Sequence, residues 1–288
     1  MIKTILVPAT GTQTDSATFA AALRVARVFA AHIDALHVQI DPVATLVAMT
    51  TEGSGGAVIG SLIEQLEQDV REREAKAKRI FVEFCGRERL SITAAPAEAG
   101  TNPSAQWHVE TGDEPRWMTN YSLAADLIVA SRGTTDDATE RSTLEAVLVE
   151  TGRPLLIPSI GAPSVDMTER IAIAWKSTPQ TVRAVAAAMP FLARAAEIVV
   201  MTVQEEEGRR DDTDRLMRNL QWHGLKAVAQ RLTPDGGSAA DTLLSAATGK
   251  VGLLIMGGYG HSRLREWVFG GFTQQLLVSA PVPVLMVH

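Results

Sequence analysis

The most informative segment of the sequence reads Leu253-Leu254-Ile255-Met256-Gly257-Gly258-Tyr259-Gly260 and continues to a second glycine pair, Gly270-Gly271. An apolar run of strand length ends in glycines, and the second pair opens an apolar, helix-like segment from Phe272 to Val278. Glycines after a strand and at a helix start let backbone amides approach a phosphate, because no Cβ stands in the way. A proline-bounded strand, Pro283 to Val287, then closes the chain. The succession of strand, glycine loop, helix and strand predicts the last part of a repeated α/β unit.

Composition and charge narrow the classes to which the protein can belong. The chain has 288 residues, 46% of them hydrophobic and 21% charged, which suits about two globular domains with real cores. A net charge of −6 disfavours a nucleic acid as partner. No apolar run approaches the ~20 residues needed to span a bilayer, so we expect no membrane partner.

The N-terminus and the cysteine content bear on localisation. Met1 to Ile5 enter a strand directly, without the pattern of a signal peptide. The single cysteine, Cys85, excludes an intrachain disulfide and, beside Phe84 in a helical pattern, is interpreted as a packing residue. The six histidines share no metal-ligand spacing. We therefore expect a cytoplasmic protein with no metal held by its side chains alone.

Strand and helix patterns alternate through the first half. Ile5 to Pro8 is a short β-branched run that ends in a loop, and residues 15–31 carry apolar side chains at helical spacing. The same alternation continues with strands at 35–40, 106–110, 127–130 and 155–157 and helices at 62–84 and 115–125. Asp113 and Glu114, between a strand and a helix, are interpreted as turn and helix-cap residues and not as a catalytic pair.

The pattern restarts after a linker at residues 159–168. Lys176 follows the first strand of the second half as Thr10 follows the first strand of the chain, and Gly260 corresponds to Gly133. The separation between Gly133 and Gly260 is shorter than the separation between Thr10 and Lys176. The first half therefore contains extra residues between Thr10 and Gly133, which we interpret as an insertion. Alternating strands and helices at this spacing predict parallel βαβ units with right-handed crossovers.

This repeat predicts both the fold and the place of a ligand. We predict an α/β fold of two tandem doubly wound, Rossmann-like domains with parallel five-stranded sheets, at residues 1–160 and 161–288. Such sheets bind ligands beyond the carboxyl ends of their strands, where the strand order reverses. If the first and fourth strands of the second half are neighbours there, Ala174, Trp175 and Lys176 face the glycine motif. Val203 then lines the side of the cleft. An apolar slot, a cation and a glycine cradle suit a nucleotide.

Gly257, Gly260 and Gly270 form the pattern Gly-x2-Gly-x9-Gly after the fourth strand of the second half, and residues 280–287 close the chain. This arrangement resembles the universal stress protein family (UspA-like) in its tandem two-domain form, over nearly the whole chain. The resemblance implies an adenine nucleotide alpha hydrolase-like fold that binds ATP or a related adenine nucleotide, with or without Mg²⁺. The site residues it implies are Ala174, Trp175, Lys176, Val203, Met256, Gly257, Gly260, Gly270, Gly271, Phe272 and Thr273.

The resemblance also implies how the two domains associate and what the protein does. In this family the last strands of two domains pair, so residues 155–157 and 284–287 are expected to form the seam of an internal pseudo-dimer. A further homodimer and the identity of a protein partner stay open. By this resemblance the protein is a sensor or regulatory module of the stress response.

Three positions depart from the family pattern. Gly271 stands where the family usually has Ser or Thr, so a phosphate-binding hydroxyl is missing unless Thr273 replaces it. Lys176 stands where the family often has an acidic residue, and its ammonium either meets a phosphate or fills part of the pocket. The first half reads Ala130-Ser131-Arg132-Gly133 without a second glycine. We therefore expect one nucleotide site per chain, in the C-terminal domain.

Two other classes of function stay open. If the glycines of the motif serve turns and close packing alone, the protein is a nucleotide-free interaction protein that acts through its pseudo-dimer surface. An enzyme needs more than this sequence offers, since it contains neither Gly-x4-Gly-Lys-(Ser/Thr) nor Gly-x-Ser-x-Gly. Phosphoryl transfer requires a metal, a charge clamp and an oriented nucleophile. We therefore expect at most slow ATP hydrolysis.

Overall fold

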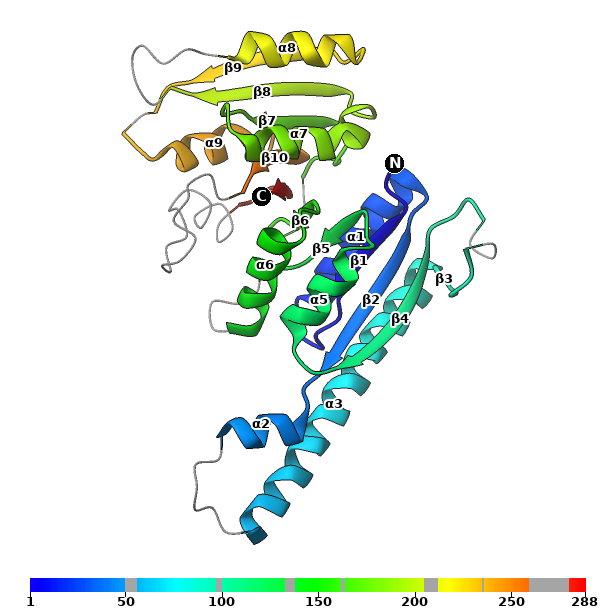
Figure 1. Ribbon diagram of the computed structural model, residues 1–288. Helices are drawn as coiled ribbons and strands as arrows, with labels where there is room; N and C mark the ends of the chain where they lie inside the picture. Colours follow the sequence, from blue (N-terminus) through cyan, green and yellow to red (C-terminus); the bar gives the residue numbers. More distant parts are fainter. Residues whose placement is uncertain are drawn as a thin grey trace. The chain divides into compact units, whose positions relative to one another are not determined.

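The computed structural model describes residues 1–49, 56–96, 100–132, 138–161, 164–204, 212–234, 236–258 and 280–288. The chain forms two compact units, Met1–Val147 and Leu148–His288, both of them α/β (Figure 1). This division falls before the predicted linker, so the strand at residues 155–157 belongs to the second unit.

The N-terminal unit is built on a parallel sheet with β1 near its centre. Its strands are β1 (Thr4–Pro8), β2 (His32–Gln39), β3 (Ser91–Ile92), β4 (Ser104–Thr111) and β5 (Leu127–Val129), in the spatial order β3-β4-β2-β1-β5. β1 pairs in parallel with β2 and β5, and β2 pairs in parallel with β4. The strand order reverses at β1, so the loop after β1 lies where such sheets bind ligands.

Helices cover both faces of this sheet. The helices of this part of the chain are α1 (Asp15–Phe29), α2 (Pro42–Met49), α3 (Gly56–Glu88), α5 (Glu114–Ser122) and α6 (Ala138–Glu150), the last of which crosses the boundary of the unit. Successive residues of a strand point to opposite faces. On β4 the ring of Trp107 lies 5.4 Å from that of Phe81 in α3, whereas the ring of His108 lies 5.5 Å from that of Tyr121 in α5. α3 therefore covers one face and α5 the other (Figure 1).

The C-terminal unit repeats this plan. Its strands are β6 (Leu155–Ile157), β7 (Arg170–Ala174), β8 (Glu197–Val203), β9 (Ala227–Leu232), β10 (Leu253–Gly257) and β11 (Val284–Val287), in the order β6-β11-β10-β7-β8-β9. Its helices among the described residues are α7 (Pro179–Leu192), α8 (Thr213–Trp222) and α9 (Ala239–Ala247). β7 pairs in parallel with β8 and β10. The predicted neighbourhood of the first and fourth strands of this half is thus confirmed.

Strand β6 joins this sheet in the opposite direction. It pairs antiparallel with β11, with Leu156 opposite Leu285. The predicted pairing of residues 155–157 with 284–287 is therefore present, whereas a pseudo-dimer of the two domains stays a prediction. Within the predicted domain 161–288, β7 to β11 are five strands joined by parallel pairings, which confirms the expected sheet. Strand β6 adds a sixth, antiparallel strand next to β11.

The sequence patterns did not predict β3 and β9, which are the outermost strands of their sheets. An edge strand has a neighbour on one side only, so fewer of its side chains need to be apolar. In β9, Val228 is 60% exposed and Gln230 and Arg231 interrupt the apolar pattern. Because the apolar and polar residues of this strand do not alternate, the sequence pattern does not predict it.

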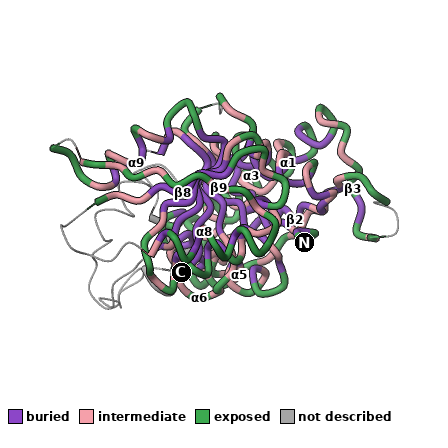
Figure 2. Tube along the Cα trace, turned by 90° about the horizontal axis from the view of Figure 1, so that it is seen from above, coloured by how far each residue is buried: buried purple, intermediate pink, exposed green. Residues whose placement is uncertain are grey.

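Buried residues concentrate in the strands (Figure 2). Residues 171–174 and 253–256 are buried along their whole length, as expected for central parallel strands covered on both faces. Cys85 is 1% exposed, and burial raises its pKa to about 11, which confirms its interpretation as an unreactive packing residue. Within the described ranges, no helix combines the length and the apolar character needed to cross a membrane.

Candidate functional site

The predicted site residues of the C-terminal half gather where β7 and β10 end. Because these parallel strands are hydrogen-bonded neighbours, Ala174 and Met256 occupy equivalent positions at their carboxyl ends. Both are buried, whereas Trp175 is half-buried and Lys176 is exposed. Gly257 completes β10. The structure therefore brings these residues to one edge of the sheet.

Val203 lies on the same edge, at the end of the neighbouring strand β8. Ala174 pairs with Met201, so Val203 lies beyond the part of β8 that pairs with β7. It pairs with Leu232 of β9 and is half-buried. The remaining predicted residues of the site, Gly260, Gly270, Gly271, Phe272 and Thr273, lie outside the described residues.

Gly257 packs directly against the first turn of helix α7. A Cβ at this position would lie 2.6 Å from the backbone nitrogen of Thr181 and 2.8 Å from Cβ of Gln180. Thr178 caps this turn, because its hydroxyl accepts a hydrogen bond from the Thr181 N–H (3.3 Å). Only glycine leaves room for the helix at this point, so packing accounts for Gly257 without a ligand.

Gln180 is a residue of this edge that the sequence analysis did not single out. Its Oε1 is buried and has no hydrogen-bond partner among the residues that the structure describes. A buried acceptor without a donor costs about 1–3 kcal/mol, so the position favours a ligand that donates an N–H or O–H. No local pattern marks Gln180, since its place beside Gly257 follows from the packing of α7 on β10.

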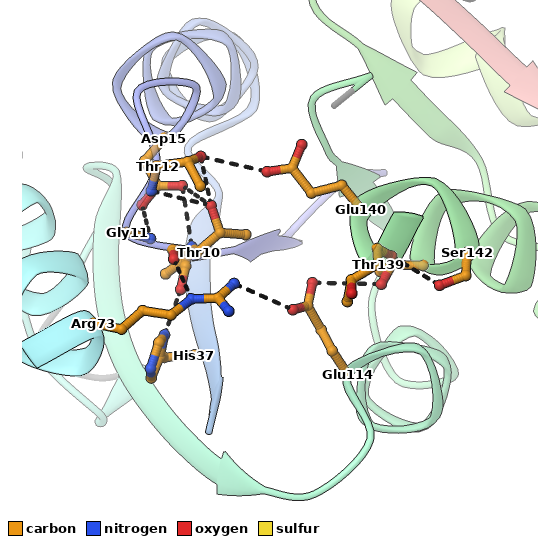
Figure 3. Close-up of polar contacts among 12 residues, drawn as sticks. Thr10, Gly11, Thr12, Asp15, His37, Arg73, Glu114, Thr139, Glu140 and Ser142 are labelled. Carbon is orange, nitrogen blue, oxygen red and sulfur yellow. Dashed lines mark hydrogen bonds and ion pairs between the residues drawn. The ribbon is translucent and has the colours of Figure 1, made fainter. Parts of the chain in front are cut away.

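At the equivalent edge of the N-terminal unit, Asp15 closes the loop after β1 (Figure 3). Its carboxylate accepts hydrogen bonds from the Thr10 N–H (3.1 Å), the Thr10 hydroxyl (2.8 Å) and the Gly11 N–H (2.8 Å). Asp15 is 2% exposed. Burial raises the pKa of Asp15, and the hydrogen bonds from Thr10 and Gly11 offset this only in part. Three donors on one buried carboxylate hold the loop in a single conformation.

Arg73 of helix α3 crosses the same edge (Figure 3). Its Nε donates to the Thr10 carbonyl (2.9 Å), and its guanidinium lies 4.0 Å from the Glu114 carboxylate. The Thr12 hydroxyl donates to the Glu140 carboxylate (3.4 Å). The space left beside Thr10, Glu114 and Glu140 is a cavity of about 10 Å³, roughly enough for one water. Among the described residues, side chains thus occupy the crevice at this edge, where a nucleotide would bind.

The interpretation of Asp113 as a helix cap is confirmed, whereas Glu114 has a different role. Asp113 accepts a hydrogen bond from the Arg116 N–H (3.0 Å) at the start of α5. The side chain of Glu114 is 11% exposed and faces Arg73 and the Thr143 hydroxyl. Glu114 therefore belongs to the polar network that fills the N-terminal crevice.

A second polar cluster of the N-terminal unit lies on β2 and β4. Oδ1 of Asp34 accepts a hydrogen bond from His108 Nε2 (2.8 Å) and lies 3.5 Å from His32 Nε2. Burial raises the pKa of Asp34, but the hydrogen bonds and charges of His108 and His32 outweigh it and hold that pKa well below its usual range. In the described part of the chain, no group of three or more His, Cys, Asp or Glu side chains is arranged to hold a metal.

Asp34→Asn is expected to lower the free energy of unfolding at pH 7 by about 1–2 kcal/mol, because it weakens the bonds from the two histidines. The pKa of Asp34 in the folded protein lies below its ordinary value of 3.8. Its contribution is therefore full above about pH 4 and is lost as the pH falls toward the folded-state pKa. Urea unfolding of both proteins between pH 7 and pH 3 should show the difference shrinking below pH 4. A difference that stays constant would contradict this.

The C-terminal half of the chain matches a known family. Residues 167–288 match the model of the Universal stress protein family. No curated protein matches the chain. The matched range contains β7 to β11 and therefore the whole edge at which the predicted site residues gather.

Solved structures of the same fold span the whole chain. A universal stress protein from Archaeoglobus fulgidus DSM 4304 is 16% identical with a TM-score of 0.65, over 99% of this chain and 97% of that chain. A functionally unknown protein from Pseudomonas aeruginosa PAO1 is 12% identical with a TM-score of 0.55, over 99% and 92%. A universal stress protein solved in complex with cAMP is 14% identical with a TM-score of 0.31. The match covers 56% of this chain and 99% of that chain. Residues 167–288 thus match the universal stress protein family, and the chain as a whole shares the α/β fold of the solved structures from Archaeoglobus fulgidus and Pseudomonas aeruginosa.

Proposed function

We propose that the C-terminal unit binds ATP or a related adenine nucleotide, and that the protein acts as a nucleotide-dependent sensor or regulatory module of the stress response. The observation that carries this proposal is the pairing of β7 with β10. Through it, Lys176 and the first glycine of the motif, Gly257, share one edge of a doubly wound sheet. Ligands of such sheets bind at this kind of edge.

The chemistry of the described residues suits such a ligand. Lys176 is an exposed cation that can meet a phosphate, and Ala174 and Val203 offer apolar surface to a base. The buried Oε1 of Gln180 is an acceptor for an amino group. Helix α7 begins beside Gly257, and a helix N-terminus favours anions.

The test begins with the freshly purified full chain. The protein is denatured, and any released nucleotide is identified by mass spectrometry. Nucleotide-free protein is then titrated with Mg-ATP by calorimetry. We expect about one nucleotide per chain, because side chains fill the crevice of the N-terminal unit. Two nucleotides per chain would contradict that structural account.

Two variants probe the C-terminal edge. Gly260→Val places a branched side chain in the glycine motif and is expected to abolish binding while the protein stays folded. Lys176→Asp is expected to weaken binding about tenfold or more if the ammonium meets a phosphate, and to strengthen it if the lysine fills the pocket. Lys250→Asp makes the same charge change at the exposed, opposite end of β10 and should leave the affinity unchanged.

One observation favours a second candidate function, a nucleotide-free interaction protein. The contact of Gly257 with the first turn of α7 explains this glycine by packing alone. In that case the surface of the expected pseudo-dimer carries the function. The absence of both a released nucleotide and a heat of binding would favour this candidate over the first.

A further inference from the structure

The N-terminal unit contains a cavity of about 190 Å³ that the proposed nucleotide site does not use. It lies at the carboxyl end of β2, between β2, α2 and α3. Figure 1 shows these two helices extending past that end of the sheet. After β8, the described part of the C-terminal unit has only α8 before the next strand. The cavity therefore belongs to the insertion of the first half.

The walls of the cavity are mainly apolar. They are formed in large part by Val38, Pro42, Leu66 and Val70. Ile40, which also lines the cavity, is 46% exposed, so apolar surface continues to the mouth. A concave, mainly apolar surface is typical of a small-molecule site, in which the polar groups determine which ligand is accepted. Half of the ten lining residues are polar.

One of the polar groups is His37, which lines the cavity although it is only 1% exposed. Its Nδ1 lies 2.6 Å from the carbonyl oxygen of Ala9. Because a carbonyl oxygen only accepts, Nδ1 carries the proton and Nε2 carries a lone pair. Nε2 has no hydrogen-bond partner within the described ranges. Burial lowers the pKa of His37 more than the bond to Ala9 raises it, so the ring is neutral at pH 7.

The lining has four further polar side chains, of which Asp69 is exposed and the other three are engaged. The Thr45 hydroxyl donates to the Asp41 carbonyl (2.7 Å). Nε2 of Gln39 donates to the Glu74 carboxylate (2.7 Å), and Nε of Arg73 donates to the Thr10 carbonyl (2.9 Å). Figure 3 shows Arg73 reaching toward Thr10 and Glu114. At His37 the cavity thus offers an acceptor and not a donor. An anion without a donor forms no hydrogen bond with Nε2, whereas a neutral O–H or N–H group donates one to it.

We propose that this cavity binds a small neutral apolar molecule of the phenol or indole class, whose single hydroxyl or N–H donates a hydrogen bond to Nε2 of His37. The cavity of about 190 Å³ is large enough for such a molecule, since an apolar cavity of about 150 Å³ holds benzene. The site is separate from the crevice of the N-terminal unit, because Asp15 and Arg73 close that crevice. It is also independent of nucleotide binding in the C-terminal unit.

The first test needs no variant. The full chain is titrated with phenol, with toluene, which has the same size without a donor, and with benzoate, which is anionic. Binding is followed by ligand-observed NMR. We expect phenol to bind with a Kd of about 1 mM or tighter, toluene about fivefold to tenfold more weakly, and benzoate not at all. Equal affinities for phenol and toluene would overturn the role of His37. A parallel titration with indole covers the second ligand class, and absence of binding of both phenol and indole would overturn the site.

Variants then locate the ligand. Val70→Trp fills the cavity from α3 and should abolish phenol binding, whereas His37→Phe keeps a ring without Nε2 and should erase the difference between phenol and toluene. Val82→Trp, at a position of the same helix that is 48% exposed, is the matched control and should bind phenol like the wild type. Circular dichroism checks that each variant is folded. Phenol binding that survives in a folded Val70→Trp protein would overturn the proposal, whatever the result with ATP.

Discussion

Gly252→Ala is expected to destabilise the C-terminal unit by about 3 kcal/mol or more. A Cβ at this position would overlap the carbonyl oxygen of Asp166 and would lie 2.6 Å from its carbonyl carbon. Both are backbone atoms, so no side-chain rotation relieves the contact. The Gly252 N–H also donates to the Arg170 carbonyl (2.8 Å), which holds the start of β10 beside β7. Moving either segment weakens the pairing of the two strands that form the candidate nucleotide edge.

Urea unfolding of the full chain, followed by circular dichroism, measures this effect. Gly86→Ala is the matched control, because Gly86 lies in α3 with no atom within 4 Å of an added Cβ. Alanine is a better helix former than glycine, so the free energy of unfolding of this variant should rise by about 0.5–1 kcal/mol. Both variants replace glycine by alanine, and their changes in the free energy of unfolding should have opposite signs. A Gly252→Ala protein as stable as the wild type would show that the segment at Asp166 gives way without cost.

Asp15→Ala is expected to destabilise the N-terminal unit by about 2–4 kcal/mol. It removes the acceptor of the Thr10 N–H, the Thr10 hydroxyl and the Gly11 N–H. Asp15 is 2% exposed, so water does not readily replace the carboxylate, and each buried donor left unpaired costs about 1–3 kcal/mol. The loop after β1 also supplies the Thr10 carbonyl to Arg73. Its loosening should therefore open the filled crevice as well.

Two comparisons isolate the hydrogen bonds of Asp15. Asp15→Asn keeps one oxygen but turns an NH₂ group toward a donor. Its loss of unfolding free energy should therefore be smaller than that of Asp15→Ala. Asp113→Ala removes an exposed helix cap and should cost about 1 kcal/mol. Hydrogen exchange at the Thr10 and Gly11 amides should accelerate in Asp15→Ala alone. If Asp15→Ala were no more destabilising than Asp113→Ala, Asp15 would not be the group that holds this loop.

Local patterns predicted most of the elements. The runs at residues 5–8 and 171–174 are β1 and β7, and the helical spacing from residue 15 onward is α1. Helices and strands repeat with different periods, so the spacing of apolar residues identifies each kind. The pattern failed at β9, where Gln230 and Arg231 break the apolar run of an edge strand.

The candidate site could be predicted only in part. Parallel strands end at the same edge of a sheet, so the sequence was sufficient to bring Ala174, Trp175 and Lys176 together with Gly257. It did not mark Gln180, whose position depends on how α7 packs on β10. The predicted residues from Gly260 onward stay a prediction.

The order of residues along the chain is sufficient to predict the alternation of strands and helices, the repeat of one unit in two halves, and the glycine motif of the C-terminal half. Three features depend on packing: Arg73 fills the N-terminal crevice, His37 lines a cavity, and Gly252 touches Asp166. The reason is physical. Spacing along the chain records the period of a single element, whereas each of these contacts joins segments far apart in the sequence, which meet only when helices and strands pack.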